Sequence, residues 1–217
     1  MSVGRARASS VWLEPDHIWF PWAVDRLTVC PLVDVSGPFY RGVADRQLQS
    51  AAPKPLYADG SLHGARYTPV GGPAGLYLAS DPAIVSTELR LIDLRGLVPT
   101  RAALKEPYVT LSVEAHVTNV LDLTDAKIRR RLRVSMAELR ADWERGMTKH
   151  AASRGVMPLT QRMGYAAHTT TLIRGLLVKP ARARHGENLV VFPDRLVAGE
   201  DSLAVFDPMG RLASRMP

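Results

Sequence analysis

Alternation of apolar and polar residues in the middle of the chain predicts a long strand that is buried on one face. Its apolar positions are Val109, Leu111, Val113, Ala115 and Val117, and the residues between them are Thr110, Ser112, Glu114 and His116. A period of two places every apolar side chain on the same side of a strand. Shorter apolar runs predict three further strands near the end of the chain, at about 172–178, 188–192 and 203–206.

A period of three to four residues begins at Thr124 and predicts helix. Its apolar positions are Ile128, Leu132, Met136, Leu139 and Trp143, and its polar face carries Lys127, Arg129, Arg130, Arg131 and Arg133. A second helix is predicted over about Leu159 to Thr171. Strands with helices between them, but without a regular βαβ repeat, predict an α+β fold: a single mixed domain with short, partly antiparallel strands and interspersed helices.

The segment between residues 64 and 88 combines local structure with polar residues suited to chemistry. Leu76–Ala79 is an apolar run bounded by Gly75 and Ser80, which predicts a short buried strand. Ser80 or Asp81 then provides an N-cap, and a proline follows in the first turn of a predicted helix. These features predict a strand followed directly by a helix.

Glu88 lies about two turns into that predicted helix, on the same side as Ile84 and Val85. A carboxylate that shares a face with apolar side chains is half-buried and needs a partner. Arg66 or Arg41 could supply it. Because Arg66, Tyr77 and Glu88 recur at equal intervals, we interpret them as a compact polar set able to bind a phosphorylated sugar.

Composition adds limits to this interpretation. With 217 residues and 46% hydrophobic content, the chain can bury a core, and its length favours one domain. The single cysteine, Cys30, excludes an internal disulfide and suits a reducing compartment. No apolar run approaches the roughly 20 residues of a membrane span, and no signal peptide is evident, so a soluble, cytoplasmic protein without a membrane partner is expected.

The first thirty residues differ from the rest. We predict that residues 1–30 are an N-terminal extension and that residues 31–217 form the domain. Three tryptophans, Trp12, Trp19 and Trp22, cluster with Phe20 in the extension. Such an aromatic cluster packs either on its own domain or on a partner.

The formal net charge of +7 invites a nucleic-acid interpretation. However, no helix-turn-helix, zinc or RNA-recognition pattern accompanies the basic run 127–133, so direct nucleic-acid binding is not predicted. The charge could equally attract an anionic substrate or an acidic protein. The six histidines are scattered without metal-ligand spacing, and no metal site is predicted.

Taken together, these motifs resemble the RES-domain toxins of bacterial toxin–antitoxin pairs. The family pattern is Gly-Gly-Arg-Trp-Asn-x-Pro, then Tyr-Leu-Ala, then Glu, and this chain has Gly64–Pro69, Tyr77–Ser80 and Glu88 at these spacings. Phe39–Arg41, Val120–Thr124, Gly175–Val178 and Asn188–Pro193 are similar to further family strands, so the resemblance spans roughly residues 36 to 208. Tyr67-Thr68 replaces Trp-Asn, and Pro180 stands where many members carry a serine.

The resemblance implies an ADP-ribosyltransferase-like fold and an enzyme that uses NAD⁺ as a substrate and breaks its nicotinamide–ribose bond. It implies that Glu88 stabilises positive charge on the ribose, that Arg41 and Arg66 bind the diphosphate, and that Tyr77 packs against nicotinamide or ribose. Tyr67 forms part of the pocket wall, and His63 could line the same pocket. The family also implies a cognate antitoxin that blocks the active site.

Three hypotheses remain open from the sequence. The leading one is a toxin that degrades NAD⁺ as a glycohydrolase, or as a phosphorylase with inorganic phosphate as co-substrate. A second is an ADP-ribosyltransferase that modifies a protein target. A third, of another class, is a non-catalytic basic binding protein.

Overall fold

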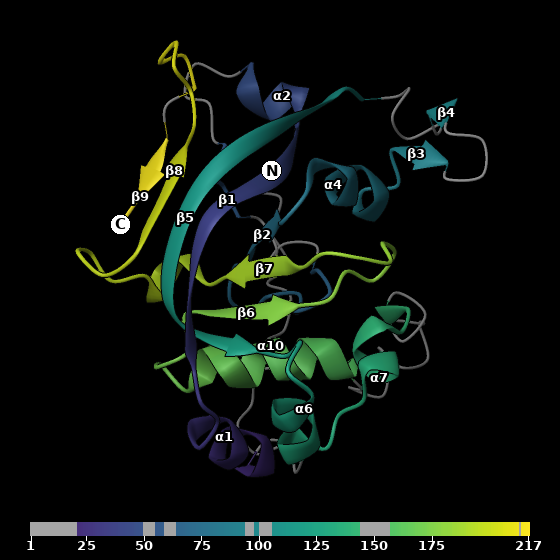
Figure 1. The fold of residues 1–217 in the computed structure, drawn as a ribbon, viewed down its shortest axis with the longest axis vertical. Coiled ribbons are helices and arrows are strands. Elements are labelled where there is room, and N and C mark those ends of the chain that lie inside the picture. Colours follow the sequence, from purple (N-terminus) through teal and green to yellow (C-terminus); the bar gives the residue numbers. More distant parts are fainter. Residues whose placement is uncertain are drawn as a thin grey trace, which may run out of the picture.

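The computed structural model describes residues 21–49, 55–58, 64–93, 98–99, 106–143, 157–212 and 214–217 (Figure 1). Trp12, Trp19, Phe20 and His63, which the sequence analysis singled out, lie outside these residues. Within the described part of the chain, no helix is long and apolar enough to cross a membrane.

A seven-stranded mixed sheet forms the centre of the molecule. Its strands are β1 (Val33–Ala44), β2 (Leu76–Ala79), β5 (Tyr108–Asp122), β6 (Gly175–Val178), β7 (Asn188–Val191), β8 (Ser202–Val205) and β9 (Arg215–Met216). The order is β1-β2-β7-β6-β5-β8-β9, and β1 also pairs with β5, so that five strands close into a ring. Only β5 and β6 are parallel. A separate two-stranded sheet joins β3 (Ile92–Asp93) to β4 (Val98–Pro99).

The helices gather around this sheet. They are α1 (Pro21–Thr28), α2 (Asp45–Leu48), α4 (Pro82–Glu88), α6 (Ala126–Leu132), α7 (Met136–Arg140) and α10 (Leu159–Thr169), with a 3-10 turn over Pro193–Arg195. Figure 1 shows α1, α6, α7 and α10 together beside β6, whereas α4 lies near β1 and β2. The predicted α+β class with interspersed helices is therefore confirmed.

The predicted one-face-buried strand is confirmed as part of β5. Leu111, Val113 and Val117 are buried, whereas Glu114 and His116 between them are exposed. The three predicted strands near the end of the chain are also confirmed as β6, β7 and β8; β6 and β7 are shorter than expected, and β8 begins and ends one residue earlier. No pattern in the sequence indicated β3, β4, β9 or α2, which are too short to carry a periodic signal.

The helix predicted from Thr124 onward is two helices. Arg133 adopts a left-handed conformation with φ of 55° and ends α6. Ser135 then starts α7: its Oγ accepts from the Glu138 N–H at 3.1 Å, and its own N–H donates to the Glu138 carboxylate at 2.8 Å. The apolar period continues across the break because Leu132 of α6 and Leu139 of α7 are buried in the same core.

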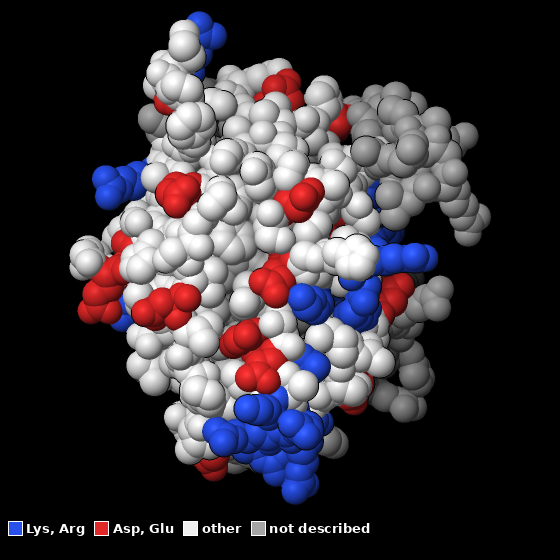
Figure 2. Space-filling view, in the orientation of Figure 1, with Lys and Arg blue, Asp and Glu red and all other residues white. Residues whose placement is uncertain are grey.

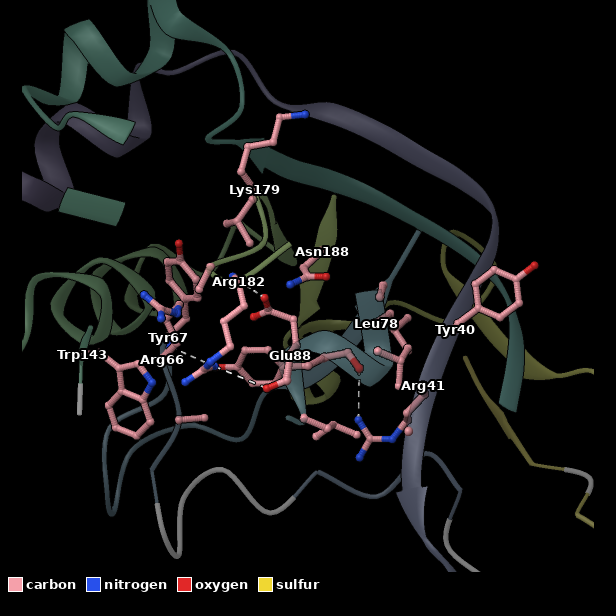
Figure 3. A pocket seen from close by; sticks show the side chains of 18 residues that line it. Tyr40, Arg41, Arg66, Tyr67, Leu78, Glu88, Trp143, Lys179, Arg182 and Asn188 are labelled. Atoms are coloured by element: carbon pink, nitrogen blue, oxygen red, sulfur yellow. Dashed lines mark hydrogen bonds between the residues drawn. The ribbon is translucent and has the colours of Figure 1, made fainter. Parts of the chain in front are cut away.

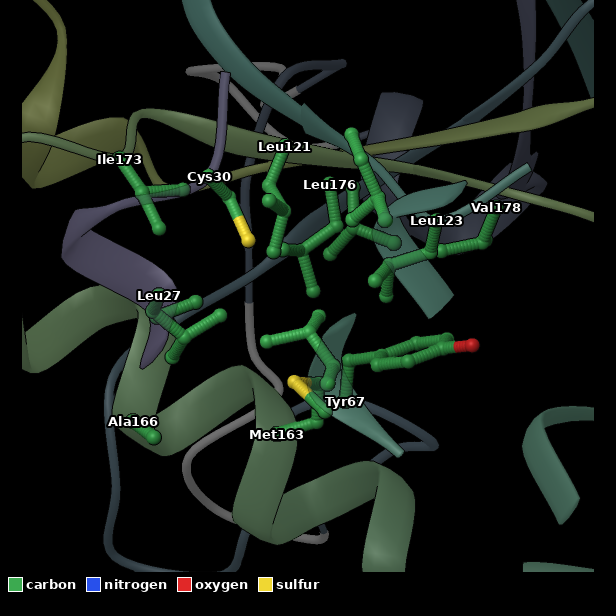
Figure 4. Packing of buried hydrophobic residues seen from close by; sticks show 14 of the residues in the cluster. Leu27, Cys30, Tyr67, Leu121, Leu123, Met163, Ala166, Ile173, Leu176 and Val178 are labelled. Atoms are coloured by element: carbon green, nitrogen blue, oxygen red, sulfur yellow. The ribbon is translucent and has the colours of Figure 1, made fainter. Parts of the chain in front are cut away.

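Two large apolar clusters stabilise the fold, and a small third one contains Ala79, Ile84 and Val85. One lies inside the ring of strands and contains Phe39, Leu78, Val113, Leu189 and Val191. The other lies between the sheet and the helices (Figure 4) and contains Leu27, Cys30, Tyr67, Leu121, Leu123, Met163, Ala166, Ile173 and Leu176. Because Leu27 and Cys30 are part of this core, the last residues of the predicted extension pack on the domain.

Basic side chains gather over α6 (Figure 2). Lys127, Arg130, Arg131 and Arg133 are all exposed. Arg129, by contrast, turns back and donates to the Leu123 carbonyl at 2.9 Å. The basic run predicted from the sequence is thus mostly a solvated helix face.

Candidate active site

A cavity of about 410 Å³ lies between α4, the ends of β2, β6 and β7, and a turn at residues 65–68 (Figure 3). This volume falls in the range of small-molecule sites. The polar and aromatic residues that line it include Arg41, Arg66, Tyr67, Tyr77, Glu88, Trp143, Lys179, Arg182 and Asn188. The structure therefore brings every predicted site residue except His63, which is not described, to one pocket.

Arg66 and Tyr67 form the tip of a tight turn. The backbones of Ala65 and Thr68 exchange two hydrogen bonds, of 2.7 and 3.2 Å. The Tyr67 N–H donates to the Tyr77 hydroxyl at 2.9 Å, and the buried Gln161 amide donates to the Ala65 carbonyl at 2.9 Å. These hydrogen bonds fix the backbone of the turn, so Arg66 and Tyr67 extend into the pocket from a rigid position.

Tyr77 contributes to the site partly through this turn. Its ring lines the pocket, as the sequence predicts, but its hydroxyl binds the Tyr67 backbone and lies 3.4 Å from the Thr68 hydroxyl. Burial raises the pKa of Tyr77 to about 12, so the phenol is neutral at physiological pH. Its hydroxyl positions the turn, whereas its ring is available to pack against a ligand.

The close approach of α10 to the turn depends on Gly164. A Cβ at this position would lie 1.8 Å from the Tyr67 carbonyl oxygen, where no atom fits. Alanine normally favours a helix over glycine by about 1 kcal/mol. We nevertheless expect Gly164→Ala to destabilise the protein by about 2 kcal/mol or more, because α10 and the turn must move apart. Thermal unfolding tests this expectation, and an unchanged or raised melting temperature would contradict it.

Glu88 is the last residue of α4. The helix starts where predicted, with the Asp81 carboxylate accepting from the Ala83 N–H at 2.7 Å. Ile84 and Val85 are buried, which directs the Glu88 side chain toward the pocket. Its Oε1 accepts from the Arg182 N–H at 2.6 Å. The partner of the half-buried carboxylate is therefore a backbone amide, and not the guanidinium of Arg66 or Arg41 that the sequence suggested.

The two predicted arginines also support the walls of the pocket. Arg66 Nη1 donates to the carbonyls of Leu139 and Ala141, at 3.2 and 2.6 Å, and so holds the end of α7. Its other guanidinium nitrogens make no hydrogen bond to a described residue. Burial lowers the pKa of Arg66, and the nearby Tyr67 and Glu88 oppose this effect. The guanidinium stays charged at neutral pH.

Arg41 lies at the opposite side of the pocket from Arg66 (Figure 3). Its Nη1 donates to the Tyr77 carbonyl at 3.4 Å, and its Nη2 donates to the Tyr57 carbonyl. Burial lowers the pKa of Arg41 to about 10, which still leaves it charged at neutral pH. Arg41 is thus a half-buried cation whose charge no described carboxylate neutralises by an ion pair.

Sequence reasoning missed several residues of the pocket: Trp143, Lys179, Arg182 and Asn188. Arg182 and Asn188 come from the connection between β6 and the start of β7, about a hundred residues after Glu88. In the sequence, each of them is only a polar residue close to an apolar strand. Polar residues in such places are also common on protein surfaces that bind nothing, so they did not stand out. Pro180 is buried beside them, and Ala181 and Arg182 line the pocket directly after it.

Three buried polar atoms of the pocket have no hydrogen-bond partner among the described residues. They are Arg41 Nε, Tyr67 Oη and Asn188 Oδ1. Buried polar groups in folded proteins are normally paired, so these unpaired atoms on residues that line the cavity are candidate partners for a ligand. Burial also raises the pKa of Tyr67, which keeps its hydroxyl protonated as a donor.

The charge of the pocket favours an anion. Arg41, Arg66, Lys179 and Arg182 line it together with one carboxylate, Glu88. Lys179 is partly neutralised by Glu187, whose carboxylate lies 3.1 Å from its Nζ. In the described part of the chain, no three acidic, histidine or cysteine side chains are grouped so that they could hold a metal ion. The site is therefore a cationic pocket with a single fixed carboxylate.

No family model and no curated protein matches this sequence. The fold, however, is similar to that of MbcT in a crystal structure of the M. tuberculosis MbcT–MbcA toxin–antitoxin complex. The two chains are 21% identical, the TM-score is 0.58, and the match covers 86% of this chain and 92% of the other. The resemblance expected from the sequence is thus confirmed at the level of the fold.

Proposed function

We propose that this protein is the toxin of a toxin–antitoxin pair and that it degrades NAD⁺ by cleaving the nicotinamide–ribose bond. The observation that carries the proposal is the pocket itself, in which one fixed carboxylate, Glu88, faces a surplus of arginines. This combination suits a dinucleotide whose diphosphate is anionic and whose ribose becomes positively charged as nicotinamide leaves. The shared fold with MbcT, which was crystallised with an antitoxin, supports the same reading.

In the proposed reaction, the main role of Glu88 is to stabilise the positive charge that develops on the ribose. The bond between ribose C1′ and the pyridine nitrogen breaks, and its electron pair leaves with nicotinamide, which becomes neutral. The ribose ring then carries oxocarbenium-like positive charge. Water attacks C1′ and releases a proton, giving ADP-ribose; phosphate in place of water gives a phosphorylated ADP-ribose. With Oε1 held by the Arg182 N–H, Glu88 presents a fixed negative charge to this cation.

The remaining wall residues suit the rest of the substrate. Guanidinium groups match phosphate oxygens in a bidentate manner, and Arg66 keeps nitrogens that bind no described residue. Tyr77 and Trp143 offer aromatic faces to the nicotinamide ring. No step of this chemistry requires a metal ion.

The test is the release of nicotinamide by the purified protein. NAD⁺ is incubated with the protein with and without inorganic phosphate, and the products are separated by chromatography. Free nicotinamide with ADP-ribose identifies a glycohydrolase, and a phosphate-dependent product identifies a phosphorylase. Label transfer from NAD⁺ to a protein identifies an ADP-ribosyltransferase. No release of nicotinamide under any condition would refute the proposal in favour of a non-catalytic binding protein.

Arg66→Lys is expected to weaken NAD⁺ binding by about 1–3 kcal/mol, the range for a hydrogen bond to a charged group. Lysine keeps the charge but loses the planar fork, so it cannot hold the end of α7 and a phosphate oxygen together. Binding measured by calorimetry checks this result. Arg130→Lys, on the exposed face of α6, is the matched control and should bind NAD⁺ as the wild type does. Equal affinities of the two variants would remove Arg66 from substrate binding.

A partner completes the proposal. An enzyme that consumes NAD⁺ without restraint would kill its own cell, so we include a cognate antitoxin that covers the pocket. The cationic pocket favours an antitoxin segment with acidic side chains or a carboxylate.

A further inference from the structure

Asn188 occupies a rigid position at the edge of the pocket. It is the first residue of β7, and its backbone is paired with Ala79 of β2 on one side and Val178 of β6 on the other. Two residues further along the strand, Val190 faces the core between the sheet and the helices. Because side chains alternate along a strand, Asn188 continues that face beyond the core and into the pocket.

The side-chain amide of Asn188 makes no hydrogen bond within the described structure. Its Oδ1 is buried and unpaired. Gln161, the other amide near the site, is buried too, but its Nε2 donates to the Ala65 carbonyl at 2.9 Å. The other residues of β7 are aliphatic. An unpaired amide at the first position lowers stability, because it is removed from water and gains no hydrogen bond within the protein. A ligand group that pairs with the amide explains its presence.

A side-chain amide presents one donor and one acceptor side by side. A primary carboxamide carries both a donor and an acceptor, so it can pair with the oxygen of this amide as well as with its nitrogen. A carboxylate or a methyl ketone at the same place has no donor and leaves the amide oxygen unpaired. In NAD⁺ the only primary carboxamide is on the nicotinamide ring, close to the bond that breaks.

The position of Asn188 relative to Glu88 supports this end of the substrate. Figure 3 shows both side chains directed into the same part of the pocket, with Arg182 beside Glu88. If Glu88 faces the ribose cation, the ring attached to that ribose lies next to Asn188. Adenine also offers a donor and an acceptor to an amide. The adenine end, however, is separated from the reacting ribose by the whole diphosphate.

We propose that Asn188 determines specificity by pairing its side-chain amide with the carboxamide of the nicotinamide ring. The assignment rests on the proposed NAD⁺ cleavage and identifies the part of the substrate that the pocket recognises. Asn188 is thus a specificity residue, distinct from Glu88, which acts on the reacting ribose.

The test compares NAD⁺ with its 3-acetylpyridine analogue, in which a methyl ketone replaces the carboxamide. The wild type should prefer NAD⁺ by about tenfold or more in kcat/KM, the effect of one buried group left unpaired. Asn188→Leu, which has a similar volume, should lower kcat/KM for NAD⁺ by about tenfold or more and leave the analogue within about twofold. A merely structural role would lower both substrates in proportion, and that result would overturn the assignment.

A third substrate tests the adenine alternative. Nicotinamide hypoxanthine dinucleotide keeps the carboxamide but changes the base, so its ratio to NAD⁺ should be the same in the wild type and in Asn188→Leu. A ratio that changes on substitution would mean that Asn188 binds the base, and would overturn the assignment. Thermal unfolding shows whether Asn188→Leu is folded; if it is not, Asn188→Ala replaces it.

Binding of the free rings separates this inference from the proposed function. Nicotinamide and 3-acetylpyridine are titrated into the wild type and the Asn188 variant and followed by ligand-observed NMR. If the wild type releases no nicotinamide from NAD⁺, the proposed function fails, yet tighter binding of nicotinamide that disappears in the variant would still support Asn188. Equal binding of both rings to the wild type would overturn the inference, whatever the outcome for turnover.

Discussion

Glu88→Gln is expected to release nicotinamide from NAD⁺ at least about 10²-fold more slowly than the wild type while binding NAD⁺ with similar affinity. One lost electrostatic contact in a transition state has an effect of this size. Glutamine keeps an oxygen that accepts from the Arg182 N–H, so the 2.6 Å contact and the fold are preserved. Only the negative charge opposite the ribose cation is removed. Initial rates and calorimetric affinities measured on the same preparations check both halves of this prediction.

Glu114→Gln is the matched control for Glu88→Gln. Glu114 is an exposed residue of β5 that does not line the pocket, and its neutralisation should leave turnover unchanged. If both variants turned over NAD⁺ at the wild-type rate, Glu88 would have no part in the mechanism. If both slowed equally, the effect would come from net charge and not from the position of the carboxylate.

Expression of the wild type alone in bacteria is expected to stop growth and to lower cellular NAD⁺, because uncontrolled cleavage exhausts the cofactor pool. The Glu88→Gln protein, made at the same level, should do neither. Co-expression of the neighbouring open reading frame should restore growth if that frame encodes the antitoxin. Growth curves and NAD⁺ measured in extracts give the two readouts.

The alternative hypothesis, a non-catalytic protein that binds through the basic surface of α6, predicts a different result in the same experiment. If the protein acted by binding an acidic or nucleic-acid partner, toxicity would depend on the exposed cations Lys127, Arg130 and Arg133 and would survive Glu88→Gln. A triple substitution of these cations to glutamine should leave NAD⁺ depletion intact on the proposed mechanism. Growth arrest that persists in the Glu88→Gln strain with normal NAD⁺ would therefore reject the enzymatic reading.

Local patterns were sufficient to predict most of the secondary structure around the site. The strand Leu76–Ala79 and the helix that begins after Asp81 occur where capping and apolar periodicity place them. Glu88 shares a face with Ile84 and Val85 because residues three and four apart are neighbours on a helix. Patterns of this range depend on contacts close in sequence, so they can be read without knowing the rest of the fold.

The break at Arg133 marks where such reading fails. The apolar period runs through both α6 and α7, and only the left-handed residue and the Ser135–Glu138 capping box reveal the end of one helix and the start of the next. A hydrophobic period records which side chains face the core, and two short helices on the same core can continue one period. The pattern therefore predicted the buried residues but not the chain path between them.

Patterns in the sequence were enough to predict the class of the fold, the segment that carries Arg66, Tyr77 and Glu88, and the resemblance from which NAD⁺ chemistry is proposed. The groups that these residues contact are seen only once the chain is folded. The Arg182 amide that holds Glu88 and the carbonyls at the end of α7 that hold Arg66 both come from segments distant in the chain. Hydrogen bonds of this kind leave no periodic trace in a sequence, since they require only that two remote polar groups meet when the sheet closes.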